Sequence, residues 1–401
     1  MATGSLIARR TAKTAIVLAA LLILGPYAVG PIYQFPDPTS FSGAELYNPY
    51  AEPSATWQRA NFHSHGRAWM GLTNGEQPSE EVARRYRALG YDVPGVSNYQ
   101  RIAINPGVST LPIYEHGYNI TKQHQLAIGA HSVEWLDFML WQSRSHQQYV
   151  IDRVRRKSDL VALAHPATRD AYTVDDMQAL TGYDLIEIVN GPFSAVDVWD
   201  AALSSGHPVW AVADDDTHDL EDQRRTAVGW NMVGADSADR RDIVDALDAG
   251  RTYAVLRLGA IEAANLTVLN RVEVNGAQMR VSLNGAASNI TFVGQNGVVR
   301  KTVAGANTAD YIFSDRDTYI RTVVETPQTV LYLNPVLRYD GKTLPSPSAH
   351  LDATATWTFR RNIVLGLGLS AWVLSRWRQS RRAVPSTVTG TVLTGVKGNT
   401  V

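Results

Sequence analysis

Between about Trp57 and Gly250, short apolar runs of the kind found in β-strands alternate with helical stretches. This alternation is typical of a parallel sheet or barrel, in which a helix carries the chain from one strand to the next. The expected strands are 59–62, 92–97, 111–114, 125–130, 160–164, 185–189 and 208–213, and the expected helices are 79–89, 173–180 and 236–249. The pattern predicts an α/β domain over residues 57–250.

The hydrophobic pattern changes from about Thr252 to Leu344, where the chain consists of short runs that alternate between apolar and polar residues. These runs are separated by three Asn-Gly pairs, at 275–276, 284–285 and 296–297. Asn-Gly between apolar runs is the strongest short-range hairpin signal, because both residues tolerate a positive φ. We therefore expect a small antiparallel β-sandwich over residues 251–345.

The chain is long and nearly neutral, and it contains no cysteine. Its 401 residues, 45% of them hydrophobic, are enough for two folded units. The 37 basic and 38 acidic side chains give a net charge of −1, so we expect no nucleic-acid partner bound by overall charge. The lack of Cys excludes disulfides, Cys-ligated zinc, iron–sulfur clusters and a Cys nucleophile.

An uncharged, apolar stretch covers residues 14–35 and follows Arg9, Arg10 and Lys13. Its length suits a bilayer crossing, and the preceding basic residues predict a cytoplasmic N-terminus at 1–13. The expected location is the cell membrane, with the main domains extracytoplasmic. A cleaved signal peptide is the alternative, since Ala28 and Gly30 have the small-residue spacing of a cleavage site, although a proline follows directly.

A second apolar stretch lies at 363–374, between arginines on both sides. We expect a second transmembrane helix over 360–376, with the basic cluster behind it returning to the cytoplasm. An interfacial amphipathic helix is the alternative. The Thr-, Gly- and Val-rich tail at 384–401 is expected to be disordered.

Metal-binding residue types lie near the ends of the expected strands. Taken singly, each is more often an ordinary surface or structural residue. They are His63, His65, Glu115, His124, His165 and Asp216. Each is expected at the C-terminal end of a strand or in the loop that follows, where parallel barrels gather functional residues. Imidazoles with carboxylates and no thiolate suit Zn, Mn or Fe.

The ordered motifs resemble the PHP (polymerase and histidinol phosphatase) superfamily of metallohydrolases. They are Asn-Phe-His-Ser-His at 61–65, the segment 92–99, Glu115, His124, Ala-His-Pro at 164–166 and Asp-Thr-His at 216–218. The later half, with Gly-Arg-Thr-Tyr at 250–253 and Leu-Asn-Pro at 333–335, is similar to the C-terminal module of exported members related to carbaryl hydrolase. The resemblance covers roughly residues 57–345.

This resemblance implies a distorted seven-stranded β/α barrel that holds two or three metal ions. The first ion would be held by His63, His65, Glu115 and Asp216. Glu115 would bridge to a second ion, which His124 and His165 also hold. Asn74, Asn98 and Tyr99 stand where the family has Asp and an Asp-His pair, so two divalent ions (Mn, Zn or Fe) are expected and a tight third is doubtful.

The expected reaction is attack of a metal-activated water on a phosphoester. His218 is a candidate proton donor or phosphate contact, Arg67 is a candidate phosphate contact, and Asp214 and Asp215 would orient the ligand loop. The expected substrate is a phosphorylated small molecule or envelope component, and the oligomeric state stays open. Two alternatives remain: hydrolysis of carbamate or carboxyl-ester bonds, and a non-catalytic envelope binding or assembly protein on a degraded barrel.

Overall fold

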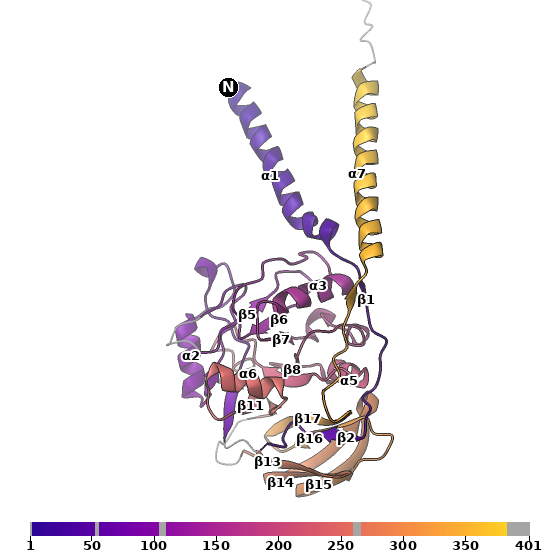
Figure 1. Cartoon of the computed structure of the whole chain (residues 1–401). Helices are drawn as coiled ribbons and strands as arrows, with labels where there is room; N and C mark the ends of the chain where they lie inside the picture. The colour runs from indigo at the N-terminus through magenta and orange to yellow at the C-terminus, as the bar shows by residue number, and fades with distance from the viewer. Residues whose placement is uncertain (1, 53–55, 104–109, 260–265, 383–401) are drawn as a thin grey trace, which may run out of the picture. The chain divides into compact units, whose positions relative to one another are not determined.

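The computed structural model describes residues 2–52, 56–103, 110–259 and 266–382 (Figure 1). The chain divides into two compact units, Met1–Asp352 and Ala353–Val401. Within the described residues, the second unit consists of one helix, α7 (Ala353–Arg382). The predicted disordered tail at 384–401 lies outside the described residues.

The helices of the first unit are mostly short. They are α1 (Ala2–Val29), α2 (Ser79–Ala88), α3 (Arg144–Arg155), α4 (Val174–Met177), α5 (Val196–Ser204) and α6 (Arg240–Asp248), with single-turn helices at Trp69–Gly71, Thr168–Asp170 and Gln295–Gly297. The strands of the barrel side are β3 (Trp57–Asn61), β4 (Val93–Pro94), β5 (Ile113–His116), β6 (Gln125–Ile128), β7 (Leu160–Leu163), β8 (Leu185–Asn190), β9 (Phe193–Ser194), β10 (Trp210–Asp214) and β11 (Gly229–Gly234). The others are β1 (Tyr33–Gln34), β2 (Glu45–Tyr47), β12 (Thr252–Arg257), β13 (Leu269–Asn275), β14 (Gln278–Gly294), β15 (Val298–Ile312), β16 (Tyr319–Glu325), β17 (Thr329–Tyr339) and β18 (His350–Leu351).

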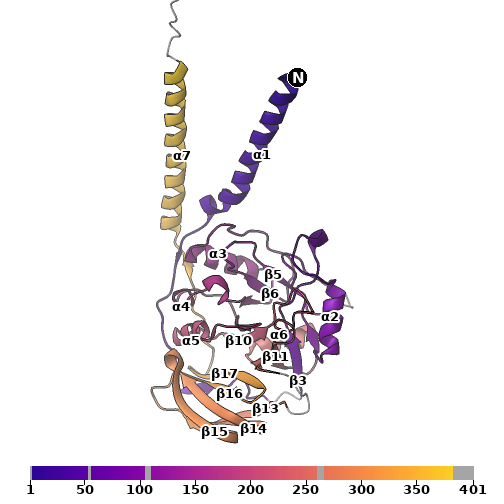
Figure 2. The ribbon, with the colours of Figure 1, turned by 180° about the vertical axis from the view of Figure 1, so that it is seen from behind.

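One curled sheet has the strand order β10-β8-β7-β6-β5, with β9 beside β8. Every residue of these five main strands is buried, because other elements cover both faces of the sheet. The strands therefore appear in the sequence as nearly continuous apolar runs. Helix α3 packs on β6 and β7, and α5 packs on β8 (Figure 2).

A second, larger sheet has the order β13-β14-β16-β17-β12-β11-β3-β4, with β15 beside β14 and β2 beside β17. Two isolated parallel bridges link it and its loops to the first sheet: Ser64 with Thr217, and Tyr99 with Glu115. The first bridge lies just beyond β3 and β10, and the second includes a residue of β5. The sheet edges that carry the predicted site residues are therefore joined.

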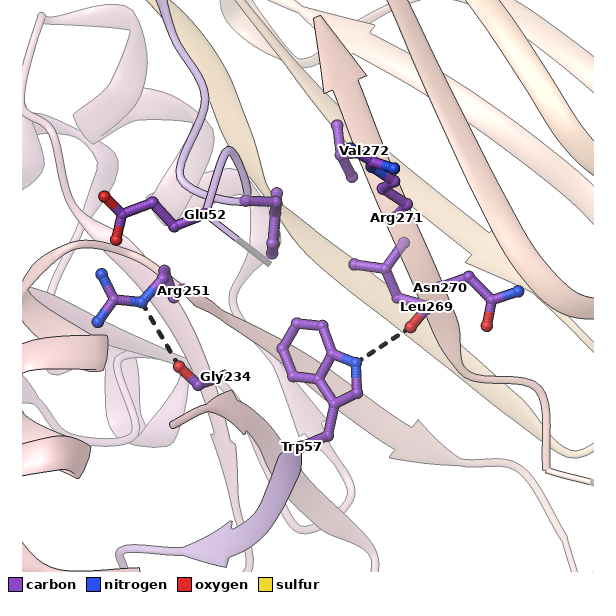
Figure 3. A pocket seen from close by; sticks show the side chains of 9 residues that line it. Glu52, Trp57, Gly234, Arg251, Leu269, Asn270, Arg271 and Val272 are labelled. Atoms are coloured by element: carbon purple, nitrogen blue, oxygen red, sulfur yellow. Dashed lines mark hydrogen bonds between the residues drawn. The ribbon is translucent and has the colours of Figure 1, made fainter. Parts of the chain in front are cut away.

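Polar contacts also tie the antiparallel strands to the α/β part. Arg321 of β16 donates two hydrogen bonds of 2.7 Å to Asp200 of α5, and both side chains are buried. Asn334 of β17 accepts from the backbone NH of Ala211 in β10. The indole of Trp57 donates to the carbonyl of Leu269 beside a small pocket of about 140 Å³ (Figure 3). None of the predicted site residues lines that pocket.

Most predicted elements are confirmed within a few residues, and the structure is a mixed α/β fold with curled sheets. Thr173 caps α4 in a reciprocal capping box with Asp176, and Gly90 follows α2 with φ 82°. The Asn-Gly pairs at 275–276 and 296–297 form turns, since β13 pairs with β14 and β14 with β15 across them. The pattern thus predicts where most elements lie.

Two expectations are wrong. The segment 125–130 is not a parallel strand, because β6 runs antiparallel to both β5 and β7. The pair Asn284-Gly285 makes no hairpin; it lies inside the 17-residue strand β14, where the register with β15 shifts. Helices α3 and α5 and strand β11 were not predicted. Helix α3 begins at a capping box whose N-cap residue is Ser143, and the reciprocal partner is His146 rather than the usual Glu or Gln.

The predicted division at residues 250 and 251 falls inside one continuous sheet. Strand β12 pairs with β11 on one side and with β17 on the other. The backbone pairing therefore runs unbroken from β4 to β13. The assignment of 57–250 and 251–345 as separate domains stays a prediction.

Among the described residues, one segment has the length and hydropathy of a membrane span, Thr11–Val29 of α1. None of its residues is fully buried, although Tyr27 near its C-terminal end is half-buried. Such an N-terminal apolar helix is either a signal sequence or an anchor. Helix α7 is long enough to cross a bilayer but less apolar, so the second span predicted at 360–376 stays a prediction.

Candidate metal centre

Four predicted ligands from three strand ends converge in the first cluster. The Nε2 atoms of His63 and His65 lie 3.1 Å apart. Asp216 Oδ1 lies 3.2 Å from the first of these nitrogens and 3.1 Å from the second. Glu115 Oε2 lies 3.5 Å and 3.1 Å from the same two nitrogens. The four ligand atoms are all within 4.8 Å of one another.

A second cluster shares Glu115 with the first. The other carboxylate oxygen of Glu115, Oε1, lies 2.6 Å from His124 Nδ1 and 3.0 Å from His165 Nε2. Each oxygen of this carboxylate therefore faces a different group of imidazoles. The two clusters thus share one carboxylate. All six predicted ligands come together in the two clusters.

The backbone explains why these segments meet. His65 NH donates to Thr217 O at 2.8 Å, and Asp216 NH donates to His63 O at 2.9 Å, so the ends of β3 and β10 hold each other. Asp216 and His165 both have a positive φ, 49° and 33°. Non-glycine residues pay about 1 to 2 kcal/mol for that region, and such strain concentrates at functional sites.

His124 reaches the centre for a reason that differs from the expected one. It precedes β6 and so lies at the N-terminal end of a strand. Because β6 is antiparallel to its neighbours, this end lies at the same edge as the C-terminal ends of the parallel strands. The backbone NH of Ala164 donates to His124 O at 3.1 Å, which places His165 next to it.

The ligand atoms fit divalent cations. Ligands about 2.0 to 2.2 Å from one ion lie about 3 to 3.5 Å from each other, which matches the first cluster. Glu115 Oε2 and Asp216 Oδ1 both face the first cluster, are buried and have no hydrogen-bond partner among the described residues. Buried acceptors without donors are costly, so their gathering indicates positively charged ligands.

The electrostatics also favour cations. Burial by itself would raise the pKa of Glu115, but the His124 and His63 imidazoles outweigh it and hold that pKa well below its usual value. Burial would likewise lower the pKa of His63, yet the Asp216, Glu187 and Glu115 carboxylates raise it well above normal. The carboxylates around His63 therefore favour a positive charge in the first cluster. Burial lowers the pKa of His124, and a neutral imidazole is the form that binds metal.

Glu187 is a functional candidate that the sequence reasoning missed. It lies in β8 and is buried, with Oε1 3.1 Å from His63 Nδ1. A carboxylate can only accept, so His63 Nδ1 carries the proton and Nε2 turns its lone pair to the cluster. The other oxygen accepts from His165 NH at 2.5 Å. The sequence could have indicated this role. Glu187 is the one charged residue in the apolar run 185–189, and a charged side chain in a buried strand is rarely without a partner.

The two aspartates before Asp216 hold the loop in place. Asp215 accepts hydrogen bonds from Tyr86 Oη at 2.6 Å and from the backbone NH of Val228 at 2.8 Å. Asp214 Oδ1 accepts from Phe62 NH at 2.6 Å. Both side chains are fully buried. Their contacts agree with the expected role in orienting the ligand loop.

Tyr99 fills the space beside the first cluster. Its ring stacks on His65, with centroids 4.4 Å apart. Burial and the Glu115 and Asp216 carboxylates raise its pKa, so the phenol keeps its proton. Asn98 accepts from Gly66 NH at 2.8 Å, a structural contact.

His218 and Arg67, the two residues predicted to contact the substrate, lie at different distances from the clusters: His218 is beside the first cluster, whereas Arg67 is on the surface. His218 Nδ1 lies 2.8 Å from Asp216 O, and its ring stacks 4.3 Å from that of His65. Arg67 is exposed, and its guanidinium donates to Glu76 O. Arg225, which was not predicted, lies closer to the ligands, with Nη1 3.8 Å from Asp216 Oδ2. The roles of His218 and Arg67 stay predictions.

Comparisons with known proteins add a distant likeness. No family model and no curated protein matches the chain. A solved structure from Bacteroides vulgatus, described as a two-domain protein containing a predicted PHP-like metal-dependent phosphoesterase, is similar with a TM-score of 0.39 and 13% identity. The match covers 79% of this chain and 99% of the other.

Proposed function

We propose that the chain is a metal-dependent hydrolase of phosphoester bonds on a PHP-type barrel, exported and held at the cell membrane by α1. The observation that supports it best is the Glu115 carboxylate, whose two oxygens face two separate imidazole clusters. Strands β3, β4, β5, β6, β7, β8 and β10, linked by the two isolated bridges, would form the seven-stranded barrel. The strands from β13 to β17 would form the appended sandwich.

In this proposal His63, His65, Glu115 and Asp216 hold one divalent ion, and Glu115, His124 and His165 hold a second. Two such ions supply an acidified water as nucleophile and neutralise charge on the phosphoryl oxygens. Imidazole and carboxylate donors suit Mn, Zn or Fe. Tyr99 occupies the side of the first cluster, which argues against a third tightly held ion.

Two residues next to the candidate ligands, His218 and Arg225, would contact the substrate. A carbonyl only accepts, so His218 Nδ1 donates to Asp216 O and its buried Nε2 presents a lone pair. Burial and the neighbouring His65 lower the pKa of His218 to about 4, so the side chain is neutral near pH 7 and can contact the substrate only as a neutral imidazole. Arg225 would contact the phosphoryl oxygens, a role for which it is better placed than Arg67.

The test compares phosphoester and carboxyl-ester substrates on the purified full-length chain. We expect turnover of p-nitrophenyl phosphate or bis-p-nitrophenyl phosphate that a chelator abolishes and Mn or Zn restores. Glu115→Gln should lower kcat at least about a hundredfold, because the shared ligand is lost. Glu134→Gln is the matched control: Glu134 is also buried, but it pairs with Arg153 and Lys157 away from the centre.

Two outcomes contradict the proposal. Turnover of p-nitrophenyl acetate alone would favour the carbamate or carboxyl-ester hydrolase. Metal-free protein whose stability is unchanged by His63→Ala would favour the non-catalytic alternative.

A further inference from the structure

A cavity of about 540 Å³ opens beside the metal centre. One part of its wall is His124, a ligand of the second cluster, and another is Tyr99, which stacks on His65. Much of the remaining wall is aromatic or apolar and includes Trp69, Leu72, Tyr118 and Trp135. A molecule whose phosphate reached the ligands would rest its other parts against these rings.

Large apolar side chains in the segments that line this cavity are left exposed. We call the set the apolar rim: Trp69, Leu72, Tyr118 and Trp135 line the cavity, and Met70 and Ile120 are sequence neighbours of lining residues. Met70 is 100% exposed, Leu72 85% and Ile120 58%. Trp69 and Trp135 pack edge to face at 5.9 Å. Contiguous exposed apolar groups of this kind mark contact with another apolar surface.

The rim is continuous with the residues that hold the end of α1. Ile120 NH donates to Met139 O at 2.9 Å. The next two backbone NH groups, of Leu140 and Trp141, both donate to Tyr27 Oη, at 2.8 and 3.0 Å. Tyr27 belongs to the apolar span Thr11–Val29. The rim therefore lies a few residues from the end of the one described segment with the character of a membrane span.

The surface has the composition of a membrane interface. Tyr27 packs on Trp141, with ring centroids 4.9 Å apart, and Trp141 and Trp135 are 56% and 57% exposed. Trp and Tyr are enriched where a bilayer meets water, because their rings are apolar at one end and polar at the other. Lys122, with its ammonium 5.9 Å from the Tyr99 ring, adds a cation to the cavity wall, which suits an anionic head group.

We infer that the mouth of the metal centre lies at the bilayer surface and that the substrate is a phosphoester amphiphile drawn from the bilayer. Its phosphate would meet the two ligand clusters, and its apolar part would lie in the cavity and along the apolar rim. The substrate class rests on the proposed function, whereas the membrane contact rests on the rim and its link to α1.

The membrane contact can be tested without an activity assay. Because the chain contains no Cys, a single introduced Cys can be labelled specifically. Single-Cys variants Ile120→Cys and Ile312→Cys of the full-length chain are labelled with a fluorophore and placed in phosphatidylcholine nanodiscs that contain brominated acyl chains. The two isoleucines are similarly exposed, 58% and 63%, but Ile312 ends β15, far from the rim in the sequence. The label at 120 should be quenched several-fold more than the label at 312. Equal quenching at both, or none at 120, overturns the inference.

The substrate class is tested with two pairs that share a head group and differ in their chains. These are phosphatidate against glycerol 3-phosphate, and phosphatidylglycerol against glycerophosphoglycerol, with the lipids in phosphatidylcholine vesicles. In at least one pair, kcat/KM should be about tenfold or more higher for the lipid. Ile120→Asp should lower lipid turnover about tenfold, and the matched control Ile312→Asp should keep it.

The outcomes separate the inference from the proposed function. Equal turnover of both members of a pair, with no effect of Ile120→Asp, overturns the inference and leaves the phosphoesterase standing. Quenching at 120 without cleavage of any phosphoester, soluble or lipid, refutes the proposed function and the substrate class together, while the membrane contact survives.

Discussion

Residues that touch no substrate decide how well the candidate ligands perform. Glu187 fixes which nitrogen of His63 faces the cluster, and it also binds the backbone NH of His165. One carboxylate thus orients a ligand of each cluster. Sequence reasoning named all six residues of the two clusters because each is a polar residue near a strand end. It missed Glu187 because that residue lies in the middle of a strand and its role depends on contacts with His63 and His165, which lie beyond the ends of β3 and β7.

Glu187→Gln should weaken metal binding by about 10- to 100-fold, because an amide orients the His63 tautomer less well and supplies no negative charge. Competition with a chromogenic chelator measures the affinity. Glu134→Gln removes a buried carboxylate outside the centre and should leave the affinity unchanged. Equal affinities of wild type and Glu187→Gln would show that this glutamate is only structural.

His207 makes stability depend on acid pH. Burial lowers its pKa from 6.5 to about 4 in the folded chain. Between these pH values the unfolded chain binds a proton that the folded chain excludes, so this contribution is complete above about pH 6.5 and is lost as the pH falls towards 4. It amounts to at most about 3 kcal/mol. In His207→Gln the free energy of unfolding, measured in urea, should fall less steeply over this range; an unchanged slope would contradict the assignment.

At the scale of the elements, local patterns predicted where strands and helices occur but not how they pair. The run at 125–130 has the composition of a buried strand in either direction, so its antiparallel placement depends on β5 and β7 rather than on its own residues. Asn284-Gly285 shows the same limit. No turn forms at this pair, because the residues on both sides of it belong to one long strand, β14, which pairs with β13 and β15. Helix α3 went unpredicted because its N-terminal cap uses a histidine.

The buried pair between α5 and β16 is an element-scale contact whose loss is predictable. Arg321→Met should lower the free energy of unfolding by about 3 kcal/mol, because it leaves Asp200 buried and unpaired. Adding Asp200→Asn should recover part of this, since the uncompensated charge is gone. Urea denaturation of the two variants and the wild type measures both effects.

Arg280→Met is the control for that experiment. Arg280 pairs with Asp310 at the same distance of 2.7 Å, but both side chains are exposed. Exposed pairs contribute little, so this variant should unfold almost like the wild type. A loss as large as that of Arg321→Met would show that burial does not set the value of these pairs.

For the whole molecule, the central question is whether α1 remains attached. The sequence left an anchor and a cleaved signal open. In the structure, Tyr27 Oη has three hydrogen-bonded contacts to residues 140 and 141, and the Tyr27 ring packs on Phe138 at 5.3 Å. Cleavage behind Ala28 or Gly30 would remove that tyrosine from the folded unit. The contacts therefore favour retention, as does the proline that directly follows Gly30 in the sequence.

Retention predicts that the mature chain keeps residues 11–29 and stays in the membrane fraction through an alkaline carbonate wash. Intact mass measurement of the chain purified from membranes gives its N-terminus directly. A mature N-terminus between residues 29 and 31 would show that α1 is a signal sequence. A reporter fused behind Val384 checks the other end: it should be cytoplasmic if 360–376 spans.

The most direct test of the whole account is an anomalous difference map from crystals of the full-length chain grown with Mn²⁺. The account predicts two peaks that share Glu115, one among His63, His65 and Asp216 and one beside His124 and His165. A map with no peak at these side chains, or with Glu115 bound to neither, would contradict it.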